Sequence, residues 1–305
     1  MANTKEIKGR INSIKDTQKI TNAMYMIAST KMRKAKSELD YTRPYFDALR
    51  AEIKRLFRIE SKVESRYFYP ADGSPVPENT YGCLVITADK GLAGAYNQNV
   101  IKEAQRMLAE HDDMKLFVVG EYGRRFFQKA GIPIEQSFLY TAQNPTMQRA
   151  REISNILLSR YDKGELGKIF IIYTDLKSGM QEEAKAARLL PFHRSYFASE
   201  EERPVKEPFE FIPNLRTVLE TGVRSYVSGY IYSALVDSFC SEQNARMAAM
   251  SAANDNAEKM LSHLSVQYNR VRQAAITQEI TEVSAGAKAQ RKKRMKEIKK
   301  LRNGG

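Results

Sequence analysis

Residues 242–283 read EQNARMAAMSAANDNAEKMLSHLSVQYNRVRQAAITQEITEV. Within this stretch, mostly apolar and small side chains recur at alternating spacings of three and four residues. This is the pattern of a helix that winds around a second helix, because a repeat of 3.5 residues keeps one face turned towards the partner. We call this row of positions the C-terminal seam: Met247, Met250, Asn254, Ala257, Leu261, Leu264, Tyr268, Val271 and Ala275.

The helix that carries this seam is predicted to be long. No proline follows Pro213, so nothing in the sequence forces an end to the helix between Asn214 and Val283. Gly222 and Gly229 lower the helix propensity of its first part without breaking it. A helix of this length is typical of a coiled coil or a shaft rather than of an ordinary globular helix.

The beginning of the chain carries a second seam with the same spacing. Its helix starts near Asn3, and Pro44 is predicted to end or kink it at Arg43, with a further helical piece from Tyr45 to Ile59. The simplest structure pairs the two ends of the chain as antiparallel helices. The N-terminal seam consists of Ile11, Ile14, Gln18, Thr21, Tyr25, Ala28, Met32, Ala35 and Leu39.

Between the two ends, the pattern changes to short β-branched runs that alternate with helical segments. This alternation predicts βαβ units and a largely parallel sheet. The pair Glu182-Glu183 is interpreted as part of a solvated helix face. Predicted strands are Tyr81–Thr87, Lys115–Val119, Ile132–Phe138 and Lys168–Thr174; predicted helices are Leu92–Glu110, Glu121–Ala130 and Met147–Asp162.

The expected fold class is therefore α/β, or α+β taken over the whole chain. A long antiparallel two-helix coiled coil is formed by the N- and C-terminal segments, with an inserted βαβ (Rossmann-like) domain between them. Turn-forming residues at 69–79 and a charged, proline-rich linker at 199–213 separate the parts. The expected divisions are an N-terminal helix (1–60), the inserted domain (78–198), a C-terminal helix (213–287) and a basic tail (288–305).

The charge balance points to an acidic partner. The chain has 305 residues with 49 Lys and Arg against 36 Asp and Glu, a net charge of +13. Such a charge suits nucleic acid, an anionic membrane surface or an acidic protein. Residues 288–302 contain nine basic side chains and one Glu, and a block this dense is usually solvated.

The sequence shows no recognisable arrangement of the residue types that form catalytic, cofactor or metal sites in other proteins. The loop ADKGLAGAYN (Ala88–Asn97) follows a strand and opens a helix, so it could cradle a phosphate, although its glycines more readily serve the turn. The three histidines are scattered, and Cys83 and Cys240 form no metal-binding pair. The sequence therefore predicts no catalytic residue, no cofactor and no metal.

Several motifs resemble those of one family, the ATP synthase gamma subunits. The resemblance extends over nearly the whole chain and is strongest at the two ends. In the loop Ala88–Asn97, Ala88 and Ala93 stand where that family usually has Ser and Cys. The motifs are ARMAAM (245–250), Asp255-Asn256-Ala257, Tyr268-Asn269-Arg270, RQAAITQEI (272–280), IKGRI (7–11), TQKIT (17–21) and AMYM (23–26).

The resemblance implies a non-catalytic central rotor stalk of a bacterial-type F1Fo ATP synthase. Such a stalk couples proton-driven rotation of the c-ring to conformational changes of the alpha and beta subunits. It also implies contact with the epsilon subunit, no nucleic-acid partner, and a peripheral position at the cytoplasmic face of the bacterial cell membrane. The positions that match contacts between shaft and hexamer are Arg272, Gln273, Thr277, Glu279, Arg246 and Met24.

Two alternatives from other functional classes stay open at this point. A basic coiled-coil protein could bind nucleic acid through charge alone, and its binding would depend strongly on salt. A nucleotide-dependent enzyme built on the inserted domain would require the loop Ala88–Asn97 to hold a phosphate. Association with alpha and beta subunits distinguishes the stalk from the first alternative, and a nucleotide titration tests the second.

Overall fold

The computed structural model describes residues 4–59, 64–70, 80–139, 141–176, 182–197 and 210–302. The chain forms two compact units, which we call the domain unit (residues 25–249) and the coiled-coil unit (residues 1–24 with 250–305). Helices α1 (Thr4–Ile59) and α5 (Leu215–Arg302) contribute to both units. None of the described helices is both long and apolar enough to cross a membrane. The expected turn at 69–79 and the expected linker at 199–213 lie mostly outside the described residues.

The domain unit contains a five-stranded sheet in the order β3-β2-β1-β4-β5. The first four strands are parallel, and β5 is antiparallel to β4. This confirms the inserted βαβ domain that the alternating pattern predicts. The strands are β1 (Tyr81–Ile86), β2 (Met114–Val119), β3 (Ile134–Phe138), β4 (Lys168–Leu176) and β5 (Glu182–Leu190); the intervening helices are α2 (Tyr96–Glu110), α3 (Glu121–Lys129) and α4 (Met147–Asp162).

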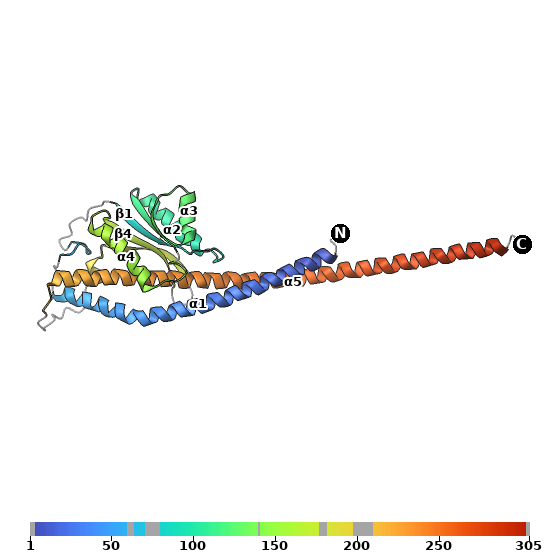
Figure 1. The fold of residues 1–305 in the computed structure, drawn as a ribbon, viewed down its shortest axis with the longest axis horizontal. Helices are drawn as coiled ribbons and strands as arrows, with labels where there is room; N and C mark the ends of the chain where they lie inside the picture. Colours follow the sequence, from blue (N-terminus) through green and yellow to red (C-terminus); the bar gives the residue numbers. More distant parts are fainter. Residues whose placement is uncertain are drawn as a thin grey trace. The chain divides into compact units, whose positions relative to one another are not determined.

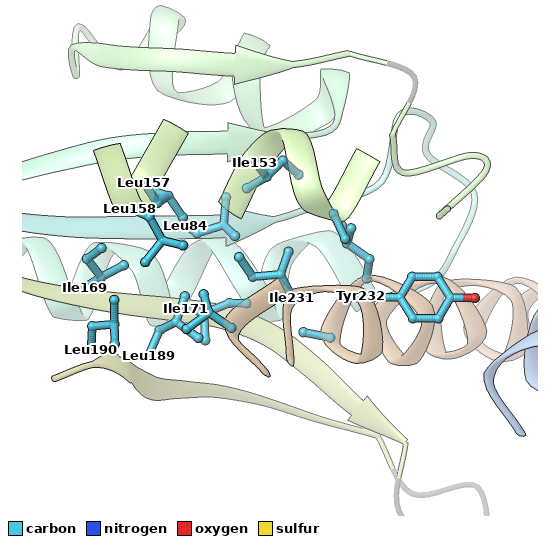
Figure 2. Close-up of a cluster of buried hydrophobic side chains, with 14 of the residues drawn as sticks. Leu84, Ile153, Leu157, Leu158, Ile169, Ile171, Leu189, Leu190, Ile231 and Tyr232 are labelled. Atoms are coloured by element: carbon cyan, nitrogen blue, oxygen red, sulfur yellow. The ribbon is translucent and has the colours of Figure 1, made fainter. Parts of the chain in front are cut away.

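The two faces of the sheet belong to two hydrophobic clusters, because successive side chains of a strand point to opposite faces. Cys83 and Val85 of β1 pack in the cluster that contains α2 and α3. Leu84 and Ile86 pack in the larger cluster, which contains α4, α5 and α1. Figure 2 shows labelled side chains of β1, β4, β5 and α4 gathered beside Ile231 of α5. The first part of α5 is thus a wall of the domain core.

Strand β5 differs from the sequence prediction. Glu182 and Glu183 begin this strand rather than lying on a solvated helix face. The segment EEAKAARLL consists of residues with high helix propensity, but its pairing with β4 along the whole segment prevails over that preference. Glu182 is half-buried and accepts a hydrogen bond of 2.8 Å from Asn244 Nδ2, and burial raises the pKa of its carboxyl.

The N-terminal helix does not end at Arg43, because α1 runs through Pro44 to Ile59. Pro44 removes one backbone hydrogen bond of the helix. The residues that follow it pack against α5, and this packing stabilises the helical conformation enough to offset the loss. A Cβ atom at Gly229 would lie 2.1 Å from ring carbons of Phe46, so only glycine leaves room for that ring. The glycine that weakens α5 as an isolated helix is therefore required where α1 approaches it.

The coiled-coil unit pairs the first residues of α1 with α5 in antiparallel directions (Figure 1). Near the domain-side end of this unit, Asn254 makes hydrogen bonds to Thr21 and Asn22. On α1, Met24 is half-buried and Tyr25 is exposed. The residue that follows Thr21 in the buried row is therefore Met24, and the predicted seam position Tyr25 is wrong. Seam positions that are buried or half-buried in this unit are Ile11, Ile14, Gln18 and Thr21 on α1, and Met250, Asn254, Ala257, Leu261, Leu264, Tyr268 and Val271 on α5.

Val271 is the last half-buried position among the described side chains of α5, which extend to Met295. With Asn254 beside Thr21, the antiparallel register brings Val271 beside Thr4, where α1 begins. The next seam position, Ala275, is exposed. Figure 1 shows α5 continuing past the start of α1 without a helix of the same chain beside it.

Candidate functional site

The candidate site is the end of α5 that the described chain leaves uncovered. Every described side chain from Arg272 to Met295 is exposed. The backbone is helical through Arg302, so these side chains lie on a regular surface with a fixed angular order. We call residues 272–283 of this end the free shaft surface.

Four of the predicted contact residues lie together on the free shaft surface. Arg272 and Glu279 are two helical turns apart and point to nearly the same side of α5. Gln273 and Thr277 are one turn apart, and the Thr277 hydroxyl donates a hydrogen bond of 2.9 Å to the Gln273 carbonyl. The helix therefore presents a cation, an amide and a carboxylate within two turns. Neither Arg272 nor Glu279 forms an ion pair with a described residue.

The free shaft surface also carries an apolar row that the sequence interpretation missed. Ile276, Ile280 and Val283 are 47%, 63% and 73% exposed. Their spacing of four and three residues places them on one stripe of the helix. The signal that identifies them is the helical period of the C-terminal seam, which continues beyond Ala275 with an offset of one residue.

Arg246 has partners within its own unit. Its guanidinium lies 2.5 Å from Glu242 Oε1 and donates a hydrogen bond of 3.1 Å to the Gly91 carbonyl. The two charged side chains are only 12% and 8% exposed. Burial raises the pKa of Glu242, and the neighbouring Arg246 opposes that rise. Contact of Arg246 with another subunit stays a prediction, as it does for the half-buried Met24.

The loop Ala88–Asn97 is held by contacts inside the domain unit. Asn97 Oδ1 accepts a hydrogen bond of 2.9 Å from the Ala88 N–H, and its Nδ2 donates to the Lys90 carbonyl at 3.4 Å. Ala88 and Ala93 pack with Tyr96 against Ala245 of α5. Their small side chains permit this approach, and Gly94 supplies a φ of 52° in the turn. The loop is thus a docking element for α5, which favours the turn interpretation over a phosphate cradle.

The two cysteines and the possible metal ligands form no recognisable reactive site among the described residues. Burial raises the pKa of both Cys83 and Cys240 to about 12, so neither thiol is an activated nucleophile. Among the residues that the structure describes, no cluster of three His, Cys, Asp or Glu side chains could hold a metal ion. The chemistry available on the free shaft surface is recognition through charge, hydrogen bonding and apolar contact.

Comparison with known proteins identifies the family. The family model described as ATP synthase matches residues 3–290. The chain is 42% identical over 292 residues to the ATP synthase gamma chain of Caldanaerobacter subterraneus subsp. tengcongensis, which covers 93% of this chain and 98% of the relative. It is 39% identical over 295 residues to the gamma chain of Acetivibrio thermocellus, with 95% and 99% covered. The chain belongs to the ATP synthase gamma chain family.

Solved structures agree with this assignment at the level of the fold. A chain of the Euglena gracilis mitochondrial ATP synthase, in a structure of OSCP, F1 and c-ring, superposes with a TM-score of 0.66 at 17% identity. That match covers 94% of each chain. A central-stalk chain from Tetrahymena thermophila gives a TM-score of 0.57 at 23% identity and covers 77% of this chain and 99% of its own. The folds of these solved chains thus resemble that of both units.

Proposed function

We propose that the chain is the central stalk subunit of an F1Fo ATP synthase. The observation that carries the proposal is the similarity to curated gamma chains over nearly their whole length. The free shaft surface supports it, because an exposed apolar stripe on a lone helix is unfavourable in water and suits a surface that a partner encloses.

In this proposal, residues 213–287 act as the shaft, and the free shaft surface contacts the alpha and beta subunits. Arg272 suits carboxylate groups of those subunits, because a guanidinium can bind a carboxylate through two parallel hydrogen bonds. The apolar row of Ile276, Ile280 and Val283 supplies contact that needs no directional partner. The charged stripe and the apolar row lie next to each other on α5, whereas the opposite side carries Ala274, Gln278 and Thr281, so the faces of the shaft are unlike one another.

Unlike faces provide a mechanism of coupling. A ligand shifts a conformational equilibrium only when it binds one state more tightly than another. A rotating shaft presents a different face to each subunit in turn, so each subunit is stabilised in a different conformation. The chain itself would then break no covalent bond, and catalysis would belong to the subunits around it.

The remaining partners follow from the same assignment. We propose that residues 78–198 and the neighbouring end of the shaft contact the epsilon subunit and the c-ring. The assembled complex would hold the chain peripherally at the cytoplasmic face of a bacterial membrane. Rotation of the c-ring by protons would turn the shaft, and ATP hydrolysis would turn it in the opposite direction.

Reconstitution with alpha and beta subunits tests the proposal. The full chain should form a complex with ATPase activity, and the Arg272→Ala, Gln273→Ala double variant should assemble but turn over about threefold to tenfold more slowly. The isolated variant should retain its circular dichroism spectrum and melting temperature because both side chains are exposed. Lys259→Ala, also exposed on α5, is the matched control and should behave as wild type.

Two outcomes would contradict the proposal at different levels. Failure of the wild-type chain to associate with alpha and beta subunits would exclude the stalk function. Normal turnover of the double variant would instead exclude Arg272 and Gln273 as contact residues and leave the stalk function intact. A nucleotide titration of the isolated chain tests the enzyme alternative, which requires saturable binding.

A further inference from the structure

A hollow of about 610 Å³ lies along the free edge of the sheet in the domain unit. Its lining includes the consecutive residues Ala186, Ala187 and Arg188 of β5, the last strand of the sheet. Consecutive side chains of a strand point to opposite faces, so a hollow lined by all three passes around the edge rather than resting on one face. Whatever occupies this hollow meets the backbone of β5.

Walls from both faces of the sheet border this edge. Arg106 of α2 lines it from one face, and Arg50 of α1 and Tyr226 of α5 line it from the other. Tyr226 is half-buried, so part of its ring stays available as an apolar wall. An extended segment would fit between these two layers of side chains.

The charged side chains that line the hollow are all basic. Arg106 is neutralised by Glu103 and Glu110, each at 2.5 Å. Arg188 instead donates to the Tyr69 hydroxyl at 2.6 Å and lies 2.7 Å from His193 Nε2. Among the described residues, no carboxylate pairs with Arg188 or with Arg50. Within the part of the chain that the structure describes, two guanidinium groups without a carboxylate partner therefore line an edge that no other described strand covers.

The backbone of the edge already meets a carboxylate from the same chain. Hydrogen bonding from Arg106 and, to a smaller extent, the nearby Ala186 N–H lower the pKa of the Glu103 carboxyl, so this N–H faces Glu103 and points away from β4. In an antiparallel pair, alternate residues direct their backbone groups to the same side. The backbone groups of Arg188 consequently point outwards as well, next to its own guanidinium.

We propose that the edge of β5 is a docking groove for an extended acidic segment of a partner polypeptide. The segment adds a strand to β5 through backbone hydrogen bonds, and its carboxylates pair with Arg50 and Arg188. Strand addition of this kind derives affinity from the backbone and specificity from alternate side chains. Guanidinium groups suit the second task because they bind carboxylates in a fixed geometry.

Peptide binding to the full chain tests the charge requirement. A fluorescein-labelled heptapeptide with Glu on both faces of the strand, Val-Glu-Glu-Val-Glu-Glu-Val, should bind in an anisotropy titration, because Arg50 and Arg188 lie on opposite faces of the sheet. The same peptide with Lys in place of Glu should not bind. The Arg50→Gln, Arg188→Gln double variant should weaken binding at least tenfold. Arg151→Gln on the exposed side of α4 is the matched control and should bind as wild type. Equal binding to all three proteins, or none to the wild type, would overturn the proposal.

A second probe tests the backbone requirement. The acidic peptide N-methylated at alternate residues keeps its charges but cannot form the strand pairing on that edge, so its binding should weaken at least tenfold. Equal affinity of the methylated peptide, or full displacement of the unmethylated one by equimolar tripolyphosphate, would show a simple anion site instead. The Arg272→Ala, Gln273→Ala variant should bind the acidic peptide normally, so this test is independent of the stalk function.

Discussion

Two segments of helix α5 carry similar apolar patterns, but one is buried and the other is exposed. In the first segment of α5, Leu219, Val223, Val227 and Ile231 recur every four residues and are completely buried in the domain core. In the last segment, Ile276, Ile280 and Val283 recur at helical spacing and are exposed. The difference teaches that apolar spacing defines a face of a helix but not what covers it. The first face serves stability, and the second is available for function.

The largest expected effect is on the free energy of unfolding, which a substitution in the first segment should lower far more than one in the last segment. Ile231→Ala should lower the free energy of unfolding of the isolated chain by about 2–5 kcal/mol, because it leaves a cavity in a packed core. Ile280→Ala removes the same atoms from an exposed site and should change it by less than about 0.5 kcal/mol. Urea unfolding followed by circular dichroism measures both. Comparable losses in the two variants would show that the last segment is covered within the isolated chain.

Asp237, which lies in the first segment of α5, should make the stability of the folded chain depend on pH. Burial, reinforced by the neighbouring Asp175, raises the pKa of Asp237 to about 6 from 3.8, while Arg43, Lys185 and Ser233 oppose the rise. The folded state thus favours the protonated acid, so the associated stability is present below about pH 4 and is lost as pH rises through 6. The loss amounts to roughly 3 kcal/mol at most.

Asp237→Asn tests this dependence, because an amide does not titrate. Relative to wild type, the variant should gain stability between pH 4 and pH 7, as measured by urea unfolding at each pH. A constant difference between the two proteins over this range would assign the pH dependence to other groups.

Two glycines of the first segment offer a finer test of the packing between α1 and α5. Gly229→Ala should destabilise the chain by about 1–3 kcal/mol, since its Cβ would lie 2.1 Å from the Phe46 ring. Gly222→Ala is the matched control: its Cβ would lie 3.8 Å from Ile53, an ordinary contact, and alanine favours helix. The control should be neutral or slightly stabilised in thermal unfolding. Equal effects would mean that Phe46 moves aside.

The smallest effect on stability is expected at the end of the exposed segment. Truncation after Ala287 removes the basic tail, whose described side chains are exposed, and should leave the melting temperature of the isolated chain unchanged. In the reconstituted complex, the truncation should change the ATPase rate, and the change should shrink at high salt because charges are screened. Identical rates at low and high salt, with and without the tail, would show that the tail has no role in turnover.

Local sequence was sufficient for most elements of the fold. The strands β1, β2 and β4 and the helices α3, α4 and α5 begin within about a residue of their predicted starts, because each has a strong period of its own. The family resemblance, and not the period of the segment, singled out four contact residues that the structure places on one exposed surface, and their contact with other subunits stays a prediction: Arg272, Gln273, Thr277 and Glu279. The apolar row beside them is a local signal and was missed because it is offset from the seam.

What the sequence by itself determined is the periodicity of each segment and, through its motifs, the family. Only the tertiary structure decided which competing local preference prevailed. It made EEAKAARLL a strand by pairing it with β4, carried α1 through Pro44 by packing against α5, and seated Arg246 beside Glu242 and Gly91. These outcomes depend on contacts between residues far apart in the chain. A periodicity identifies which face of a segment seeks a partner, whereas the identity of that partner is settled by the free energy of the whole packed structure.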